Sequence, residues 1–231
     1  MLGMVAYTNA QTNIQEMYDF NRGHLTTTLE MFHGDKWGST FFFNDIYHPD
    51  NLNTPTGYYT EIARAFNFWH NTALAPLSAH VEWNGGLGVA NCWLFGVEYF
   101  LHNADFTNTF TFELMYKSIA GQTDNTPLQF TFVWDMKNLL GVKGLTFSGF
   151  LDIWGEKVNW WTNGNGDETD WVILSEPQIW YCIGRHFGCP NLNIGGEVEL
   201  AYNFAGGWQS APWSANKGFN VAPCAGIKWV F

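Results

Sequence analysis

Aromatic and hydrogen-bonding side chains recur at every second position in two separate segments of this sequence. The first set is Phe41, Phe43 and Asp45, and the second is Glu176, Gln178 and Trp180. Residues spaced by two share one face of an extended strand. An aromatic face beside hydrogen-bond acceptors suits a nucleobase on its sugar, because stacking of a base contributes about 1–3 kcal/mol in nucleic-acid sites. The stretch 41–43 is aromatic on both faces, so alternation leaves its facing open.

Alternation assigns a larger set of ionisable side chains to one inner face. The set is Glu61, Glu82, Glu98, Glu113, Asp135, Asp152, Glu176, Glu197 and Glu199, with Lys117, Lys137, Lys228, His80 and His102. A carboxylate that faces lipid is costly, so energetics alone places these groups in water. Two interpretations stay open, a solvated and partly ion-paired interior or a series of weak solute sites. The formal net charge of -11 predicts that neutral and cationic solutes enter and phosphates do not.

The predicted solute-binding set combines both groups, and no catalytic residue, metal site or cofactor is predicted. It comprises Phe41, Phe43, Asp45, Glu61, Arg64, Glu113, Asp135, Asp152, Glu176, Gln178, Trp180, Glu197, Glu199 and Lys228. Arg64 shares a face with Ile62 and Phe66, and a charge against lipid at mid-bilayer costs about 2–4 kcal/mol. We therefore expect a bulge between Glu61 and Phe66 that turns Arg64 inward.

The elements that must position these residues are strands, because apolar side chains repeat with a period of two almost throughout. The final strand alternates up to an aromatic carboxyl terminus, Phe231, which is typical of outer-membrane barrels. The expected strands are 13–21, 24–33, 37–48, 57–70, 77–84, 91–102, 106–119, 127–138, 144–160, 169–186, 192–205 and 218–231. Pro177 and Pro223 each remove a ladder donor, so bulges or bends are expected there. The fold class predicted is all-β, a closed antiparallel transmembrane β-barrel of about twelve strands.

Connections and composition favour the same architecture. Long polar connections, such as 48–56, 120–126, 161–168 and 206–217, alternate with tight ones, such as 34–36, 103–105 and 187–191. Long loops on one side and short turns on the other are the outer-membrane arrangement, although the first connection, at Arg22, is short. Charged residues make up 13% of the chain, about half of the ~25% that is usual in soluble proteins. No apolar stretch approaches the ~20 residues of a membrane helix.

The amino terminus and the cysteines contribute less. Residues 1–10 are uncharged and end in Thr8-Asn9-Ala10, which favours a residual signal-peptide tail over a disordered terminus, with the barrel spanning 11–231. The four cysteines fit no zinc pattern. A Cys182–Cys189 disulfide and four free thiols are both open.

Five segments resemble the Tsx-type nucleoside-specific outer-membrane channel family, and in particular uncharacterised relatives of those channels. The segments are Lys36–Ile46, Tyr59–Arg64, Glu176–Tyr181, Glu197–Phe204 and Ala225–Phe231, and they occur in the family's order. The resemblance implies a twelve-stranded barrel that forms a narrow channel for small solutes.

The predicted function is passive diffusion of small neutral solutes of nucleoside type across the outer membrane of a Gram-negative bacterium. The predicted partners are outer-membrane lipid and the solute, with no nucleic acid, and a monomer is favoured. An outer-membrane barrel enzyme of lipase or protease type is the first alternative. A lipase needs a serine, a histidine and an orienting Asn or Asp on the outer wall, and none of the inward-assigned histidines lies beside an outward serine. A protease site at Asp45, His48 and Asp50 is conceivable, although His48 and Asp50 fit ordinary loop residues better. A structural barrel with a plugged lumen is the second, and a soluble carbohydrate-binding β-sandwich is the third.

Overall fold

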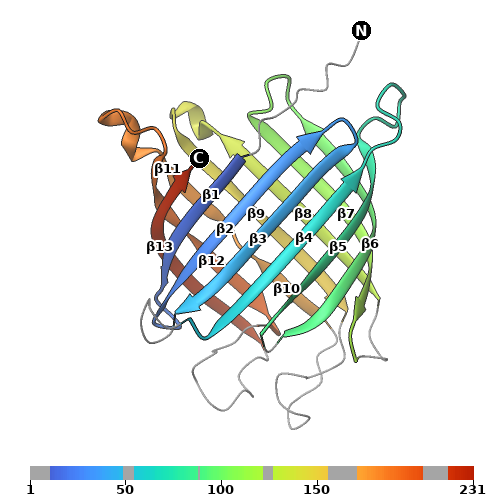
Figure 1. The fold of residues 1–231 in the computed structure, drawn as a ribbon, viewed down its shortest axis with the longest axis horizontal. Coiled ribbons are helices and arrows are strands. Elements are labelled where there is room, and N and C mark those ends of the chain that lie inside the picture. The colour runs from blue at the N-terminus through green and yellow to red at the C-terminus, as the bar shows by residue number, and fades with distance from the viewer. Residues whose placement is uncertain (1–10, 49–54, 88, 122–126, 156–170, 205–217) are drawn as a thin grey trace.

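A computed structural model describes residues 11–48, 55–87, 89–121, 127–155, 171–204 and 218–231. These residues form one closed antiparallel sheet in which strands adjacent in the chain pair, except that β10 and β11 both pair with β9 and β12, and β13 returns to β1 (Figure 1). The strands are β1 (Gln11–Asp19), β2 (His24–Asp35), β3 (Gly38–His48), β4 (Gly57–Phe66), β5 (Leu77–Gly86), β6 (Val89–His102), β7 (Asn108–Ile119), β8 (Leu128–Lys137), β9 (Leu145–Gly155), β10 (Trp171–Ser175), β11 (Gln178–Tyr181), β12 (Leu192–Tyr202) and β13 (Phe219–Val230). Two short 3-10 turns, η1 (Leu139–Gly141) and η3 (Ile183–His186), complete the described elements.

β10 and β11 are two halves of a single barrel strand. Both pair with β9 on one side and with β12 on the other, and Ser175 lies opposite Leu151 while Gln178 lies opposite Ser148. The register therefore continues unchanged across the gap, and only the ladder at Pro177 is interrupted because proline lacks a backbone donor. The barrel has twelve strands, which confirms the predicted fold class. The expected strand 169–186 ends at Tyr181, where the chain turns into η3.

Of the bulges or bends expected at the two prolines, no bulge is present, because the strand register is unchanged on either side of each proline. The carbonyl of Pro223 accepts a hydrogen bond from the backbone N–H of Phe20, directly after β1 ends. The backbone nitrogen of Pro223, which has no hydrogen to donate, therefore points toward the turn after β1, where no ladder hydrogen bond is lost. At the other site Gly149 has φ +151°, and a Cβ there would lie 2.5 Å from the Glu176 carbonyl oxygen. Glycine at this position lets the chain pass close to the proline.

Apolar side chains cover the outside of the barrel. On β7, Phe112, Leu114 and Tyr116 are exposed, whereas Glu113 and Lys117, which alternate with them, are buried. On β6 the exposed Trp93, Phe95 and Val97 likewise alternate with buried or half-buried residues, and this arrangement is the reverse of a soluble protein. Among the described residues no helix is long and apolar enough to cross a membrane.

The two ends of the barrel differ. The start of β1, the end of β13, η1, η3 and the β2–β3 and β6–β7 turns lie at one end, and the β1–β2 turn lies at the other (Figure 1). Several of the tight turns expected from the sequence thus share one rim. One connection at that rim is longer than expected because β4 ends at Phe66 instead of residue 70. Most of the predicted long loops, and the predicted signal tail, fall outside the described residues.

Candidate solute site in the barrel lumen

Four of the predicted solute-binding residues form one network on the inner face of β11, β12 and β13. Gln178 Nε2 donates to Glu197 Oε2 at 2.8 Å, and Trp180 Nε1 donates to Gln178 Oε1 at 2.8 Å. Lys228 Nζ lies 3.5 Å from the same Gln178 oxygen and 4.4 Å from the centroid of the Trp180 ring. Gly195 lies opposite Trp180, and a Cβ there would come within 2.9 Å of the indole. The glycine thus provides the space in which the indole lies.

A second aromatic group lies on the inner face of β3 and β4. The ring centroids of Phe41 and Phe43 are 5.9 Å apart, and those of Phe43 and Tyr59 are 5.7 Å apart. Tyr59 donates its hydroxyl to Glu61 Oε1 at 2.5 Å. Phe43 is paired with Glu61 across the ladder, so the two side chains share a face. This pairing settles the facing that the aromatic stretch left open, and it sets rings beside a carboxylate.

Three more predicted carboxylates lie on the inner face with a partner each. Thr28 Oγ1 donates to Asp45 and Thr131 Oγ1 donates to Asp152, both at 2.5 Å. Asp135 Oδ2 lies 3.5 Å from the Nζ of Lys137, the last residue of β8. The predicted residues therefore line the wall in several groups instead of converging on one pocket.

Arg64 does not turn inward, and the predicted bulge is wrong. β4 keeps continuous register with both β3 and β5. Arg64 stays on the outer face, where it donates to Asp35 and to Thr40 Oγ1, both at 2.9 Å, and lies over the Phe66 ring. Because the residue lies near the strand end, these partners stabilise its charge close to the rim instead of at mid-bilayer. Arg64 is therefore not part of the lumen site.

Arg22, in the β1–β2 turn, is an interior residue that the sequence reasoning missed. Its Nη2 contacts both Glu199 oxygens at 2.6 and 2.7 Å, and its Nη1 contacts Asp19 Oδ2 at 2.8 Å. Burial favours a lower pKa for the guanidinium, but the Glu199 and Asp19 carboxylates outweigh it and hold that pKa above its ordinary value. Alternation does not predict the direction of a side chain in a turn. The only sequence feature that could have indicated this ion pair was Asp19, three positions earlier.

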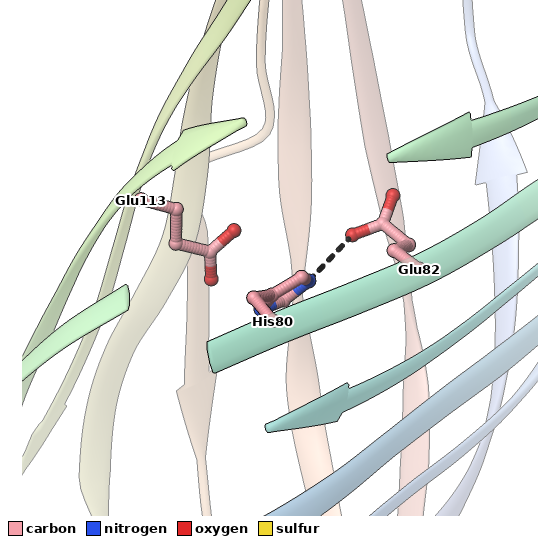
Figure 2. A group of neighbouring side chains, drawn as sticks. All are labelled: His80, Glu82 and Glu113. Atoms are coloured by element: carbon pink, nitrogen blue, oxygen red, sulfur yellow. Dashed lines mark hydrogen bonds and ion pairs between the residues drawn. The ribbon is translucent and has the colours of Figure 1, made fainter. Parts of the chain in front are cut away.

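A different inner-face group offers metal-ligand chemistry. His80 and Glu82 on β5 and Glu113 on β7 have ligand atoms that all lie within 4.8 Å of one another. Figure 2 shows the Glu113 carboxylate and the Glu82 carboxylate on opposite sides of the imidazole. The sequence placed all three on the inner face, yet it predicted no metal site. Residues from strands that are not adjacent come together only through the register of β6 between them.

The outer wall carries one polar group that bears on the enzyme alternative. Thr27 Oγ1 donates to Glu16 Oε2 at 2.7 Å and lies 3.0 Å from His48 Nε2. A catalytic triad needs a third group that orients the histidine through its other nitrogen. His48 Nδ1 is buried without a hydrogen-bond partner in the described part of the chain. Thr27 is bound to the carboxylate itself, so this arrangement does not match a triad.

Cys182, Cys189 and Cys224 are free thiols. Cys92 is buried with Leu94, Met115 and Ile119 in a small apolar cluster on the inner face. The structure therefore does not have the Cys182–Cys189 disulfide, which was one of the two alternatives.

Fold and site together define a twelve-stranded barrel with the architecture of the small porins. The chain belongs to the family described as "Domain of unknown function (DUF5020)", whose model matches residues 10–231. No curated protein matches the chain. The solved structures that share its fold include two porins. One is a "KdgM porin", with a TM-score of 0.51 and 11% identity, covering 96% of this chain and 99% of that one. The other is the NanC porin, with a TM-score of 0.59 and 9% identity, covering 94% and 98%.

At these identities the likeness concerns the fold. It supports the coarser part of the sequence resemblance, a twelve-stranded barrel of porin type. It does not support the finer assignment to the Tsx type.

Proposed function

We propose that this protein is a passive channel in a bacterial outer membrane for small neutral or cationic solutes. The observation that carries the proposal is that apolar side chains lie on the outside of the barrel. Exposed aromatic side chains such as Phe112 and Trp93 require an apolar solvent there. Inner-face residues such as Asp45, Glu61 and Glu197 are only half-buried, so water reaches them from within. Twelve strands lie between the number that side chains fill and the number that leaves a wide pore, which supports a narrow lumen.

Nucleoside-type solutes are the specific class that we propose. Phe43 and Tyr59 offer half-buried rings, and Glu61, which accepts a hydrogen bond from Tyr59, offers an acceptor beside them. A nucleoside presents a ring to stack and hydroxyls to donate, whereas a nucleotide adds a phosphate that the acidic wall repels. Several weak contacts in series let a solute pass without being trapped.

A structural barrel with a plugged lumen is a second candidate, and one observation favours it. Leu94, Met115, Gln15 and Trp180 point inward yet are almost inaccessible to solvent. Side chains therefore cover one another over parts of the wall. Conductance separates the two candidates, because a plugged barrel inserts into a bilayer without passing ions.

The test uses the full chain in planar bilayers and in liposomes. Heat-modifiable migration on a detergent gel first establishes that the barrel is folded. We expect single-channel steps with a reversal potential that indicates cation preference, and liposome swelling that is faster with adenosine than with adenosine monophosphate. Folded protein that inserts without conductance would replace the channel by the plugged barrel, and equal swelling rates would remove the selectivity.

A variant pair tests the nucleoside proposal. Phe43→Ala removes a half-buried inner ring, and Phe112→Ala removes an exposed ring at the outer wall. Loss of 1–3 kcal/mol of stacking corresponds to about 5- to 150-fold weaker adenosine binding for Phe43→Ala. Phe112→Ala should change the affinity less than about twofold. Equal effects of the two variants would contradict a stacking role for Phe43.

A further inference from the structure

The strongest unassigned cluster in the described part of the barrel is a histidine among three carboxylates. His80 Nδ1 lies 3.0 Å from Glu98 Oε2, and His80 Nε2 lies 3.4 Å from Glu82 Oε2. Glu113 lies directly opposite Glu98 in the β6–β7 ladder. All four residues are more than nine-tenths buried. Because three buried carboxylates surround one imidazole, the cluster requires a compensating positive charge.

A protonated His80 held between Glu82 and Glu98 explains only part of this cluster. That ion pair leaves Glu113 without a function, although its carboxylate is turned toward His80 (Figure 2). Within the described residues, Glu113 has no hydrogen-bond or ion-pair partner and is only 8% exposed. Like charges directly opposite each other in a ladder destabilise the sheet, so Glu98 and Glu113 repel each other unless a cation lies between them.

The lysine on the same face does not resolve this imbalance. Lys117 Nζ donates to Gln129 Oε1 at 2.6 Å and lies 3.8 Å from the centroid of the Trp154 ring. Its charge is therefore directed away from Glu113. A cation from solution meets the need better than any side chain in contact with the cluster.

We propose that His80, Glu82 and Glu113 bind a divalent transition-metal cation of the Zn²⁺ type inside the barrel. An imidazole nitrogen with carboxylate oxygens is a ligand set for such ions, whereas Ca²⁺ and Mg²⁺ take oxygen ligands alone. Glu98 has the position of an orienting partner, because metal-bound histidines commonly donate their other N–H to a carboxylate. That arrangement leaves Nε2, on the side of Glu82, to face the metal.

The geometry needs only a small contraction. Metal–ligand bonds of about 2.0–2.1 Å place neighbouring ligand atoms roughly 3.3 Å apart in a tetrahedral site. The three ligand atoms now lie within 4.8 Å of one another, so side-chain rotations of about 1–1.5 Å bring them to bonding distance. The backbone of β5, β6 and β7 is held by continuous ladders at these residues and does not need to move.

Isothermal titration of the metal-depleted full chain in detergent with ZnCl₂ tests the proposal. We expect one Zn²⁺ per chain, and at least tenfold weaker binding for His80→Gln and for Glu113→Gln. Glu98→Gln should weaken binding about 10- to 100-fold, as loss of an orienting partner does. The matched control is Glu30→Gln, which removes the same charge from the inner face of β2, where Asn13 donates to it at 2.8 Å. It should change the affinity less than about twofold.

Several outcomes would overturn the site. Equal weakening by Glu30→Gln and Glu113→Gln would show general counter-ion binding to an acidic lumen. Equal affinity for Ca²⁺ and Zn²⁺ would exclude the imidazole as a ligand, and absence of saturable binding would remove the site. If a variant fails the heat-modifiability check, the d–d absorption of Co²⁺ on the unmodified chain decides, since it reports nitrogen and oxygen ligands directly. None of these measurements depends on conduction, so the metal site and the proposed channel fail or stand separately.

Discussion

Removal of the Arg22 side chain is the sharpest test of how the interior of this barrel is stabilised. The guanidinium bonds Glu199 through two contacts and Asp19 through one, and the three side chains are 11%, 11% and 3% exposed. Arg22→Met keeps the length of the side chain but leaves both carboxylates without their cation. Breaking a buried ion pair from one side costs about 3–5 kcal/mol, and we expect about 3 because Arg22 and Glu199 retain some contact with water. That loss corresponds to roughly a hundredfold change in the unfolding equilibrium.

The assay is urea unfolding of the full chain in detergent micelles, followed by tryptophan fluorescence. The midpoint should fall while the slope stays constant, because the surface exposed on unfolding does not change. The double variant Arg22→Met/Glu199→Gln should recover part of the loss, since one unpaired charge is then neutral. The same midpoint shift should persist at high salt, because buried pairs are poorly screened.

Arg64→Met is the matched control. Arg64 also pairs with an aspartate, but the Arg64 and Asp35 side chains are 21% and 34% exposed. Pairs of this kind contribute about 0–1 kcal/mol, so the midpoint should scarcely move. If the two variants lose the same stability, or if the double variant is simply additive, the buried Arg22 cluster is not what stabilises this end of the barrel.

Three further outcomes follow from single positions. Leu114→Arg places a charge on the outer wall near the middle of β7 and should lower the unfolding free energy by about 2–4 kcal/mol in the same assay; an unchanged midpoint would contradict a lipid-facing wall. Gly149→Ala forces a side chain into a left-handed backbone opposite Pro177 and should cost about 1–3 kcal/mol, whereas full stability would show that the close approach is not real. Asp105 accepts hydrogen bonds from Thr107, which lowers the pKa of its carboxyl. A lowered folded pKa means that this turn is stabilised above the ordinary carboxyl pKa and loses that stabilisation as the pH falls through the lowered value; Thr107→Val should raise the pKa in an NMR titration, and no change would exclude the contact.

The outer and inner faces were predictable because they depend on local geometry. Successive side chains of a strand point to opposite faces, so the alternation of Leu114 with Glu113 already separates lipid from lumen. Strand number followed from the same period together with the turns. The strand ends near Phe66 and Tyr181 were less accurate, because apolar residues continue past the point where the ladder stops.

The predictions that were wrong considered the free-energy cost of a single residue without the residues that it contacts on neighbouring strands. A lipid-facing Arg64 looked too expensive, but the partner that makes it tolerable, Asp35, comes from another strand and lies near the rim. Pro177 looked as if it required a bulge, but Gly149 on the opposing strand accommodates it in register.

By itself the sequence determined which solvent each side of every strand meets, since that depends only on a period of two and on the free energy of placing charge in hydrocarbon. Only the tertiary structure decided which inner side chains touch. The Gln178, Trp180 and Lys228 network and the His80, Glu82 and Glu113 cluster both depend on strand register, which relates residues distant in the chain. A turn residue such as Arg22 has no periodicity to follow, so its inward direction is set by the carboxylates that it meets once the barrel has closed.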